Sequence, residues 1–194
     1  MLAVRGGGIT VRVDVADGAR LTSLTSGGRE WLAPSGPRSP GVFVQPGSGG
    51  WDEVVPTVAA CVLGDGAALT GTAFAGTQLA DHGDAWQSSW TLVSESATHV
   101  EASVRLTSLP ITLARRIDAS DAGIRLSYTA TTDSERPVPL FWCAHPLFSA
   151  HPGTRIRVAG KGDRPGHGLT EPRAAPLVRG SGSFRTCVLR PGRR

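Results

Sequence analysis

Three consecutive stretches, "HVEASVRLTS" (99–108), "ITLARRIDAS" (111–120) and "GIRLSYTATT" (123–132), decide the fold. Apolar and polar residues alternate along each of them, which is the pattern of a β-strand with one buried face. Short breaks at Leu109-Pro110 and at "SDAG" separate the stretches, and both breaks consist of turn-forming residues. We therefore expect an antiparallel meander of three strands joined by tight connections.

Similar patterns continue on both sides of this meander. Strands are predicted at "ITVRVDV" (9–15) and around Leu21 and Leu24, and a loop followed by a strand at residues 77–96. The stretch "VPLFWCAHPLF" (138–148) is more continuously apolar, which predicts a central strand buried on both faces. "TRIRVAG" (154–160) predicts one more strand. Because no long amphipathic helix pattern is present, the sequence predicts an all-β protein, a large antiparallel β-sandwich.

The size and composition of the chain are those of a globular protein. It has 194 residues, 40% of them hydrophobic and 19% charged, which is enough for one large all-β domain with a sizeable core. We expect residues 1–160 to form this domain. Residues 161–194 are rich in Arg, Gly and Pro without sustained alternation, so their structure is uncertain. They are either a flexible tail or an end that is out of register with the natural gene product.

Charge and cysteine usage narrow the class of protein. The net charge is +4, but seven arginines fall within residues 161–194 and no nucleic-acid-binding motif is present, so we expect no nucleic-acid partner. Cys61, Cys143 and Cys187 match no disulfide framework or zinc pattern, which favours free thiols in a reducing compartment. No stretch has the apolar length of a signal core or of a membrane helix, so the predicted protein is cytoplasmic and has no membrane partner.

The first candidate site is "GSGGWDEVVPTV" (47–58). Trp51 offers an apolar platform, and Asp52 or Glu53 offers an acceptor for a hydroxyl group. Adjacent residues on a strand point to opposite faces, so one carboxylate would line a pocket while the other faces solvent. The alternative is a polar loop that simply enters a strand.

The second candidate is "ADHGDAW" (80–86), where His82 is followed by glycine and flanked by acids. Loops on a rigid sheet are where binding residues concentrate, and Asp81 or Asp84 would orient the imidazole. The alternative is an ordinary histidine on a solvent-facing loop.

The third candidate is His145 in "FWCAHPLF" (141–148). The proline that follows favours an extended backbone at this histidine, and a polar ring in an apolar run needs a hydrogen-bond partner or a cavity. The alternative is a hydrogen-bonded core histidine. We assign no role to His99, His151 or His167, which lie in turns or in the terminal segment.

No metal or cofactor is expected. The histidines and carboxylates include no closely spaced pair of metal ligands. The glycine-rich stretches lack the lysine and the following helix of a phosphate-binding loop, and the Gly-x-Ser-x-Gly motif of a nucleophile elbow is missing from the sequence.

The order of "GARLTSL", "GGWDEVVPT", "DHGDAW" and "LARRIDAS" through "FWCAHPLF" resembles the aldose 1-epimerase (galactose mutarotase-like) superfamily over about residues 15–160. The resemblance implies a large antiparallel β-sandwich, the mutarotase-like supersandwich, whose concave face binds a sugar. It further implies that His82 holds the sugar and its ring oxygen, and that His145 donates a proton to the ring oxygen. The other groups expected at the sugar are Asp52, Glu53 and Asp84 as binding groups, and Trp51, Trp86 or Trp142 as a stacking platform.

One departure from the family concerns the general base, which in the family is a glutamate on a strand late in the chain. Nothing in residues 161–194 matches that strand, so we assign no base and expect a sandwich that is incomplete at its C-terminus. Open sheet edges then favour a homodimer. The predicted function is that of an aldose 1-epimerase-like isomerase that binds a hexose or related sugar and interconverts its anomers by general acid–base ring opening. The alternatives are a non-catalytic carbohydrate-binding domain, a truncated inactive homologue, and an interaction module in which the histidines are incidental.

Overall fold

The computed structural model describes residues 1–64, 73–154, 177–178 and 181–189. Within these residues the only helical element is the short 3-10 helix η1 (Ala85–Gln87). The strands are β1 (Leu2–Gly6), β2 (Ile9–Asp14), β3 (Arg20–Ser26), β4 (Arg29–Glu30), β5 (Gly50–Val54), β6 (Cys61–Val62), β7 (Gln78–Leu79), β8 (Thr91–Glu95), β9 (His99–Arg105), β10 (Ile111–Ser120), β11 (Gly123–Thr132), β12 (Val138–Pro139), β13 (Cys143–Leu147), β14 (Leu177–Val178) and β15 (Ser181–Leu189).

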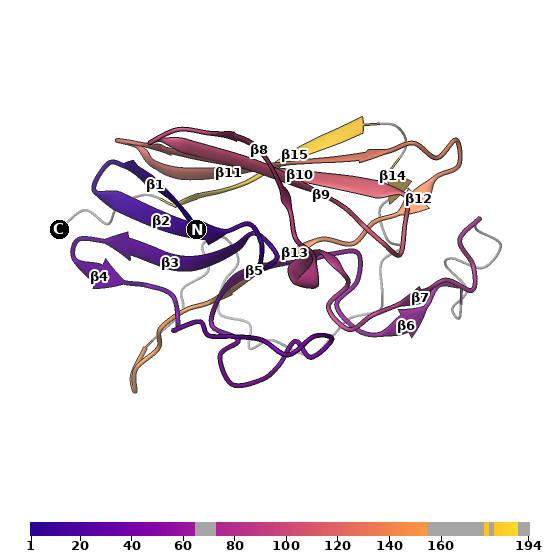
Figure 1. Ribbon diagram of the computed structural model, residues 1–194, viewed down its shortest axis with the longest axis horizontal. Coiled ribbons are helices and arrows are strands. Elements are labelled where there is room, and N and C mark those ends of the chain that lie inside the picture. Colours follow the sequence, from indigo (N-terminus) through magenta and orange to yellow (C-terminus); the bar gives the residue numbers. More distant parts are fainter. Residues whose placement is uncertain (65–72, 155–176, 179–180, 190–194) are drawn as a thin grey trace, which may run out of the picture.

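Two antiparallel sheets form the two layers of a sandwich (Figure 1). Among the described residues, one sheet has the order β1-β2-β3-β5-β13, with β4 added beside β3, and the other has the order β15-β11-β10-β9-β8. The small hairpin of β6 and β7 projects to one side of the two layers. The prediction of an all-β antiparallel sandwich is therefore confirmed.

The hydrophobic core lies between the two layers. Along β10 every second side chain is buried, from Ile111 to Ala119, and the apolar ones among them belong to the same cluster as Val11 of β2 and Leu21 of β3. Because alternate side chains of a strand point to opposite faces, this regular pattern fixes which face of each sheet turns inward. The meander predicted from residues 99–132 is confirmed as the antiparallel ladder β9-β10-β11.

Two parts of the chain differ from the sequence-based expectations. The strand β1 was not predicted, although its pairing with β2 is regular from Leu2 to Gly6. The apolar run 138–148 divides into β12 and β13, and β13 is a half-buried strand at the end of its sheet among the described residues rather than a central one. The pattern of apolar residues in a strand cannot by itself show how many other strands pair with it.

The terminal segment is partly described. Strands β14 and β15 lie within residues 161–194, and β15 pairs with β11 along most of its length. The strand predicted at 154–160 lies outside the described residues, except for Thr154. No helix in the described part of the chain is long and apolar enough to cross a membrane.

Candidate functional site

His145 lies in the middle of β13, which pairs with β5 along its whole length. In the antiparallel register His145 is opposite Asp52, and Pro146 is opposite Trp51. Directly opposed residues share one face of the sheet, so His145 and Asp52 point to the same side. That side is the outer face of the sheet, because Ala144 and Trp51, the neighbours of these two residues in the sequence, belong to the hydrophobic core between the layers.

His82 reaches the same side from a loop, and the backbone of this loop has an unusual conformation. His82 has a φ of 58°, and Gly83, which follows it, has a φ of 72°. A Cβ atom at position 83 would lie 1.8 Å from the carbonyl oxygen of Val55, so only glycine fits there. Val55 and Gly83 form a bridge, and the N–H of Asp84 donates to the carbonyl of Val55 at 2.9 Å. The His-Gly pair thus attaches the loop directly to the end of β5.

The imidazole rings of the two histidines meet although they are far apart in sequence. Their centroids are 5.8 Å apart and their planes are nearly perpendicular, at 88°. Nδ1 of His82 lies 2.8 Å from a carboxylate oxygen of Asp81, and the His82 side chain keeps 15% of its surface exposed. Nδ1 of His145 is buried and has no hydrogen-bond partner among the described residues. The structure therefore brings together the two histidines that the sequence singled out.

A third ring, that of Phe43, completes the cluster. It is stacked on His82 with a centroid distance of 3.9 Å and an interplanar angle of 6°. The same ring contacts His145 edge-on at 5.1 Å and Trp86 edge-on at 5.0 Å. Phe43 and Trp86 form a small apolar cluster with Val54, separate from the main core. The aromatic ring beside the histidines is thus Phe43, a residue that the sequence did not point to.

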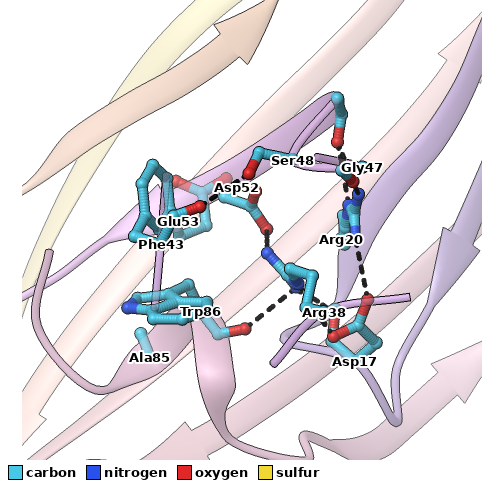
Figure 2. Close-up of polar contacts among 12 residues, drawn as sticks. Asp17, Arg20, Arg38, Phe43, Gly47, Ser48, Asp52, Glu53, Ala85 and Trp86 are labelled. Atoms are coloured by element: carbon cyan, nitrogen blue, oxygen red, sulfur yellow. Dashed lines mark hydrogen bonds and ion pairs between the residues drawn. The ribbon is translucent and has the colours of Figure 1, made fainter. Parts of the chain in front are cut away.

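Beneath this cluster Arg38 joins three segments of the chain (Figure 2). Its guanidinium donates to Asp52 at 2.8 Å, to Asp17 at 2.8 Å and to the main-chain carbonyl of Trp86 at 3.1 Å. The side chains of Arg38 and Asp52 are 5% and 2% exposed, so this ion pair is buried. Asp52, which the sequence predicted as a sugar-binding group, is therefore held by Arg38 within the wall of the site.

Arg20 supports the same region from below. Its buried guanidinium donates to a carboxylate oxygen of Asp17 and to the carbonyl of Gly47 (Figure 2). It also donates to the carbonyls of Gly36 and Gly49. A charge buried at this depth is tolerated because several acceptors surround it. Arg20 thereby fixes both ends of the loop 36–48, which carries Arg38 and Phe43.

Burial raises the pKa of Asp52 above its ordinary value, and the nearby Arg38 guanidinium opposes this rise. Burial is the largest influence because the carboxyl group loses its hydration at this position. A buried carboxyl group with a raised pKa, next to a histidine pair, is a feature that concentrates at functional sites in proteins.

Glu53 points the other way, into the core between the sheets. Its carboxylate accepts hydrogen bonds from Arg115 at 3.0 Å, from Tyr128 at 2.7 Å and from the indole of Trp142 at 2.9 Å. Burial raises the pKa of Glu53, against the lowering influence of Arg115. The expected alternation of Asp52 and Glu53 between two faces holds, but neither faces solvent. Glu53 and Trp142 do not lie beside the histidines.

The remaining predicted site residues are also buried. Trp51 is 3% exposed and lies in the main core, whereas Trp86 is 1% exposed and lies under Phe43. Asp84 accepts hydrogen bonds from the backbone of Thr107 and Ser108, at 2.6 and 2.8 Å. Asp84 therefore holds the loop that carries His82 against the connection between β9 and β10. In the described residues, no group of three or more His, Cys, Asp or Glu side chains lies close enough to hold a metal ion.

The sequence did not point to Phe43, Arg38 or Arg20 because nothing periodic marks them. A usable signal was a single aromatic residue within the loop 36–48, which is otherwise rich in Gly and Pro. Such a loop has few apolar side chains, so its one aromatic ring is expected to turn inward.

Comparison with known proteins identifies the class of fold. No family model matches the sequence, and no curated protein is significantly similar to it. Among solved structures, a galactose mutarotase-like protein from Lactobacillus casei superimposes with a TM-score of 0.61 at 17% identity, covering 78% of this chain and 50% of that one. The chain therefore has the galactose mutarotase-like β-sandwich fold, as the resemblance of its motifs implied.

Two further solved structures carry the aldose epimerase description. A putative aldose 1-epimerase from Escherichia coli K12 has a TM-score of 0.57 at 15% identity, covering 77% of this chain and 52% of that one. An aldose epimerase homologue from C. elegans has a TM-score of 0.54 at 16% identity, covering 76% and 50%. The chain spans about half the length of the structures that it matches.

Proposed function

We propose that the chain binds an aldose beside His82 and His145 and interconverts its anomers by general acid–base ring opening. The observation that carries this proposal is the convergence of two imidazole rings, 5.8 Å between centroids, on the outer face of β5 and β13. The mutarotase-like fold supports it, since this fold is shared with solved structures described as aldose epimerases.

The proposed reaction needs two proton transfers. A base removes the proton from the C1 hydroxyl group, and an acid protonates the ring oxygen as the bond between C1 and that oxygen breaks. The open-chain aldehyde rotates about its C1–C2 bond, and the ring closes on the other face with the roles reversed. We assign the acid to His145 and the orientation of the sugar to His82. Histidine suits the acid role because its unperturbed pKa lies close to neutral pH.

We do not assign the base. Asp52 is bound to Arg38 at 2.8 Å, and Glu53 is fully buried in the core with three protein donors. Neither carboxylate is therefore placed to take a proton from a sugar at the histidines. Asp81 is exposed but is hydrogen-bonded to Nδ1 of His82, which makes it a group that orients the imidazole.

A non-catalytic carbohydrate-binding domain is the second candidate function. It is favoured by this lack of a placed base among the described residues. Both candidates predict a sugar at the histidine pair and differ only in turnover. That the protein is cytoplasmic and forms a homodimer stays a prediction from the sequence.

Anomer exchange of α-glucose and α-galactose, followed by NMR with and without the protein, tests the enzymatic proposal. We expect the exchange rate to exceed the spontaneous rate, and equal rates for several aldoses would reject it. A titration of the tryptophan fluorescence with the same sugars then separates the two candidates. Saturable quenching without turnover indicates a binding domain, because Trp86 lies within one aromatic contact of the histidine pair.

A further inference from the structure

The loop 36–48 turns one side chain inward and its neighbours outward. Phe43 is 3% exposed, whereas Val42 and Val44 on either side of it are 48% and 78% exposed. A loop that simply collapsed onto the protein would bury the two valines as well, because the burial of each valine side chain is favourable. The loop therefore has a defined conformation that places the Phe43 ring against the histidines.

Hydrogen bonds within the loop explain this conformation. The hydroxyl group of Ser48 donates to the carbonyl of Phe43 at 2.7 Å (Figure 2). The same hydroxyl group accepts the N–H of Gln45 at 2.8 Å. The side chain of Gln45 accepts the N–H of Ser39 at 2.8 Å and donates to the carbonyl of Val42. The backbone at Phe43 is thus fixed on both sides by side chains of its own loop.

The Phe43 ring and Asp81 restrain the His82 imidazole in two different directions. The carboxylate of Asp81 contacts Nδ1 at 2.8 Å at the rim of the imidazole ring, and Phe43 covers one ring face at 3.9 Å. An edge contact restrains the ring against sliding, and a stacked contact restrains it against rotation about χ2, which is otherwise broad for histidine. With both contacts present, Nε2 is the nitrogen left to meet a ligand.

We infer that Phe43 is a positioning residue, which holds His82 perpendicular to His145 so that both imidazoles address one sugar. This inference rests on the proposed function for its purpose, but the geometry that it claims is testable without any sugar. The Phe43 ring contacts both histidines, and Arg38 of the same loop binds Asp52, the residue opposite His145. One loop therefore fixes the relative placement of both rings.

Three variants test this role. Phe43→Leu keeps an apolar side chain but removes the flat ring, Phe43→Tyr keeps the ring, and Val44→Ala changes the exposed neighbour as a matched control. The measurement is the NOE between ring protons of His82 and His145 in the ligand-free protein, with the melting temperature as a check of folding. We expect this NOE to be retained in Phe43→Tyr and Val44→Ala and to fall severalfold in Phe43→Leu. An undiminished NOE in folded Phe43→Leu would overturn the inference.

A fourth variant covers the case in which Phe43→Leu does not fold. Ser48→Ala removes the hydroxyl group that binds the Phe43 carbonyl and leaves the ring in place, so we expect the same NOE to weaken. An unchanged NOE there would count against the inference, because the loop would not be what fixes the ring.

Kinetics add the functional readout. If the chain catalyses anomer exchange, Phe43→Leu should lower kcat by roughly 10- to 100-fold with a smaller change in KM, since small misplacements of a reacting group have effects of this size. A weakened NOE together with unchanged kcat would overturn the positioning role. If the wild-type chain shows no response to any sugar, the proposed function is rejected. The NOE comparison would then still show whether Phe43 holds His82 in place.

Discussion

The imidazole rings of His82 and His145 stand at right angles with 5.8 Å between their centroids, although 62 positions separate them in the sequence. One ring comes from a loop in the left-handed conformation and the other from the middle of a strand. Strained backbone of this kind persists where the surrounding structure determines it strongly, and it is concentrated at functional sites. The convergence of the two rings is the basis for the first prediction.

Replacing His145 by asparagine should lower kcat for anomer exchange by roughly 10²-fold or more, the usual loss when a general acid is removed. His82→Asn should weaken sugar binding as well as turnover. NMR exchange measurements over a range of sugar concentrations would separate kcat from KM. The exposed His151 supplies a matched control, and His151→Asn should leave both constants unchanged. An undiminished rate in His145→Asn would remove its assignment as the acid.

Gly83→Ala should destabilise the protein more than a comparable change elsewhere. Gly28 has a similar φ of 76° but no heavy atom within 4 Å of an added Cβ, so Gly28→Ala should cost only about 1–2 kcal/mol for the left-handed backbone. At Gly83 the added atom would also meet the Val55 carbonyl oxygen at 1.8 Å. Urea unfolding of the two variants measures the difference. Equal losses would show that the contact with Val55 is not close.

Replacing Arg38 by methionine should cost about 3–5 kcal/mol of unfolding free energy, because it leaves the carboxylate of Asp52 buried without its partner. The double variant Arg38→Met/Asp52→Asn should recover part of this loss, since no unpaired charge remains. Arg105 provides the control: it pairs with Asp133 at the surface, so Arg105→Met should leave the melting temperature almost unchanged. If the double variant recovers none of the lost unfolding free energy, the other hydrogen-bond partners of Arg38 account for most of the loss.

Glu53→Gln should change how stability depends on pH. Burial raises the pKa of Glu53 above its ordinary value of 4.5, so the folded protein holds this proton more tightly than the unfolded chain does. The stability that Glu53 contributes is therefore full below about pH 4.5 and is lost as the pH rises through the raised pKa. The unfolding free energy of the wild type minus that of the variant should fall over this interval.

Denaturant titrations of both proteins between acidic and neutral pH check this, with Glu135→Gln at an exposed position as the control. A difference that grows with pH would mean that Arg115 keeps Glu53 ionised in the folded protein.

Much of the fold follows from local patterns. The alternation in β9, β10 and β11 specifies both the strands and their buried faces, because one-sided burial imposes a period of two. The strand β15 was missed because its partner β11 is far away in the sequence, and its own sequence, SGSFRTCVL, gives no clear alternation of apolar and polar residues. The position of β13 at the end of its sheet depends on neighbours in space, which no local pattern contains.

The site was predictable only in part, for a similar reason. The two histidines were identified from short motifs that resemble a known family. Phe43 and Arg38 come from an irregular loop, and their contacts depend on how Arg20 and Ser48 fix that loop. Trp51 and Trp142 were predicted at the sugar from their residue type. Strand alternation turns Trp51 into the core, and Trp142, which precedes β13, packs against the core and donates to Glu53. Residue types therefore suggested the chemistry of the site, whereas the three-dimensional packing determines which residues lie at the site.

Strand β5 connects the interior and the outer face through two neighbouring residues. The side chain of Glu53 points inward and binds Arg115 of β10 and Tyr128 of β11, in the opposite sheet. The side chain of Asp52 points outward from β5, and Asp52 pairs with His145 of the neighbouring strand β13. Substitutions meant to raise the melting temperature of this protein should therefore be placed at the far ends of the sheets and not in β5. A substitution in the interior at this strand would also shift Asp52 and, through the pairing of β5 with β13, His145, so a gain in thermal stability there would alter the proposed sugar site.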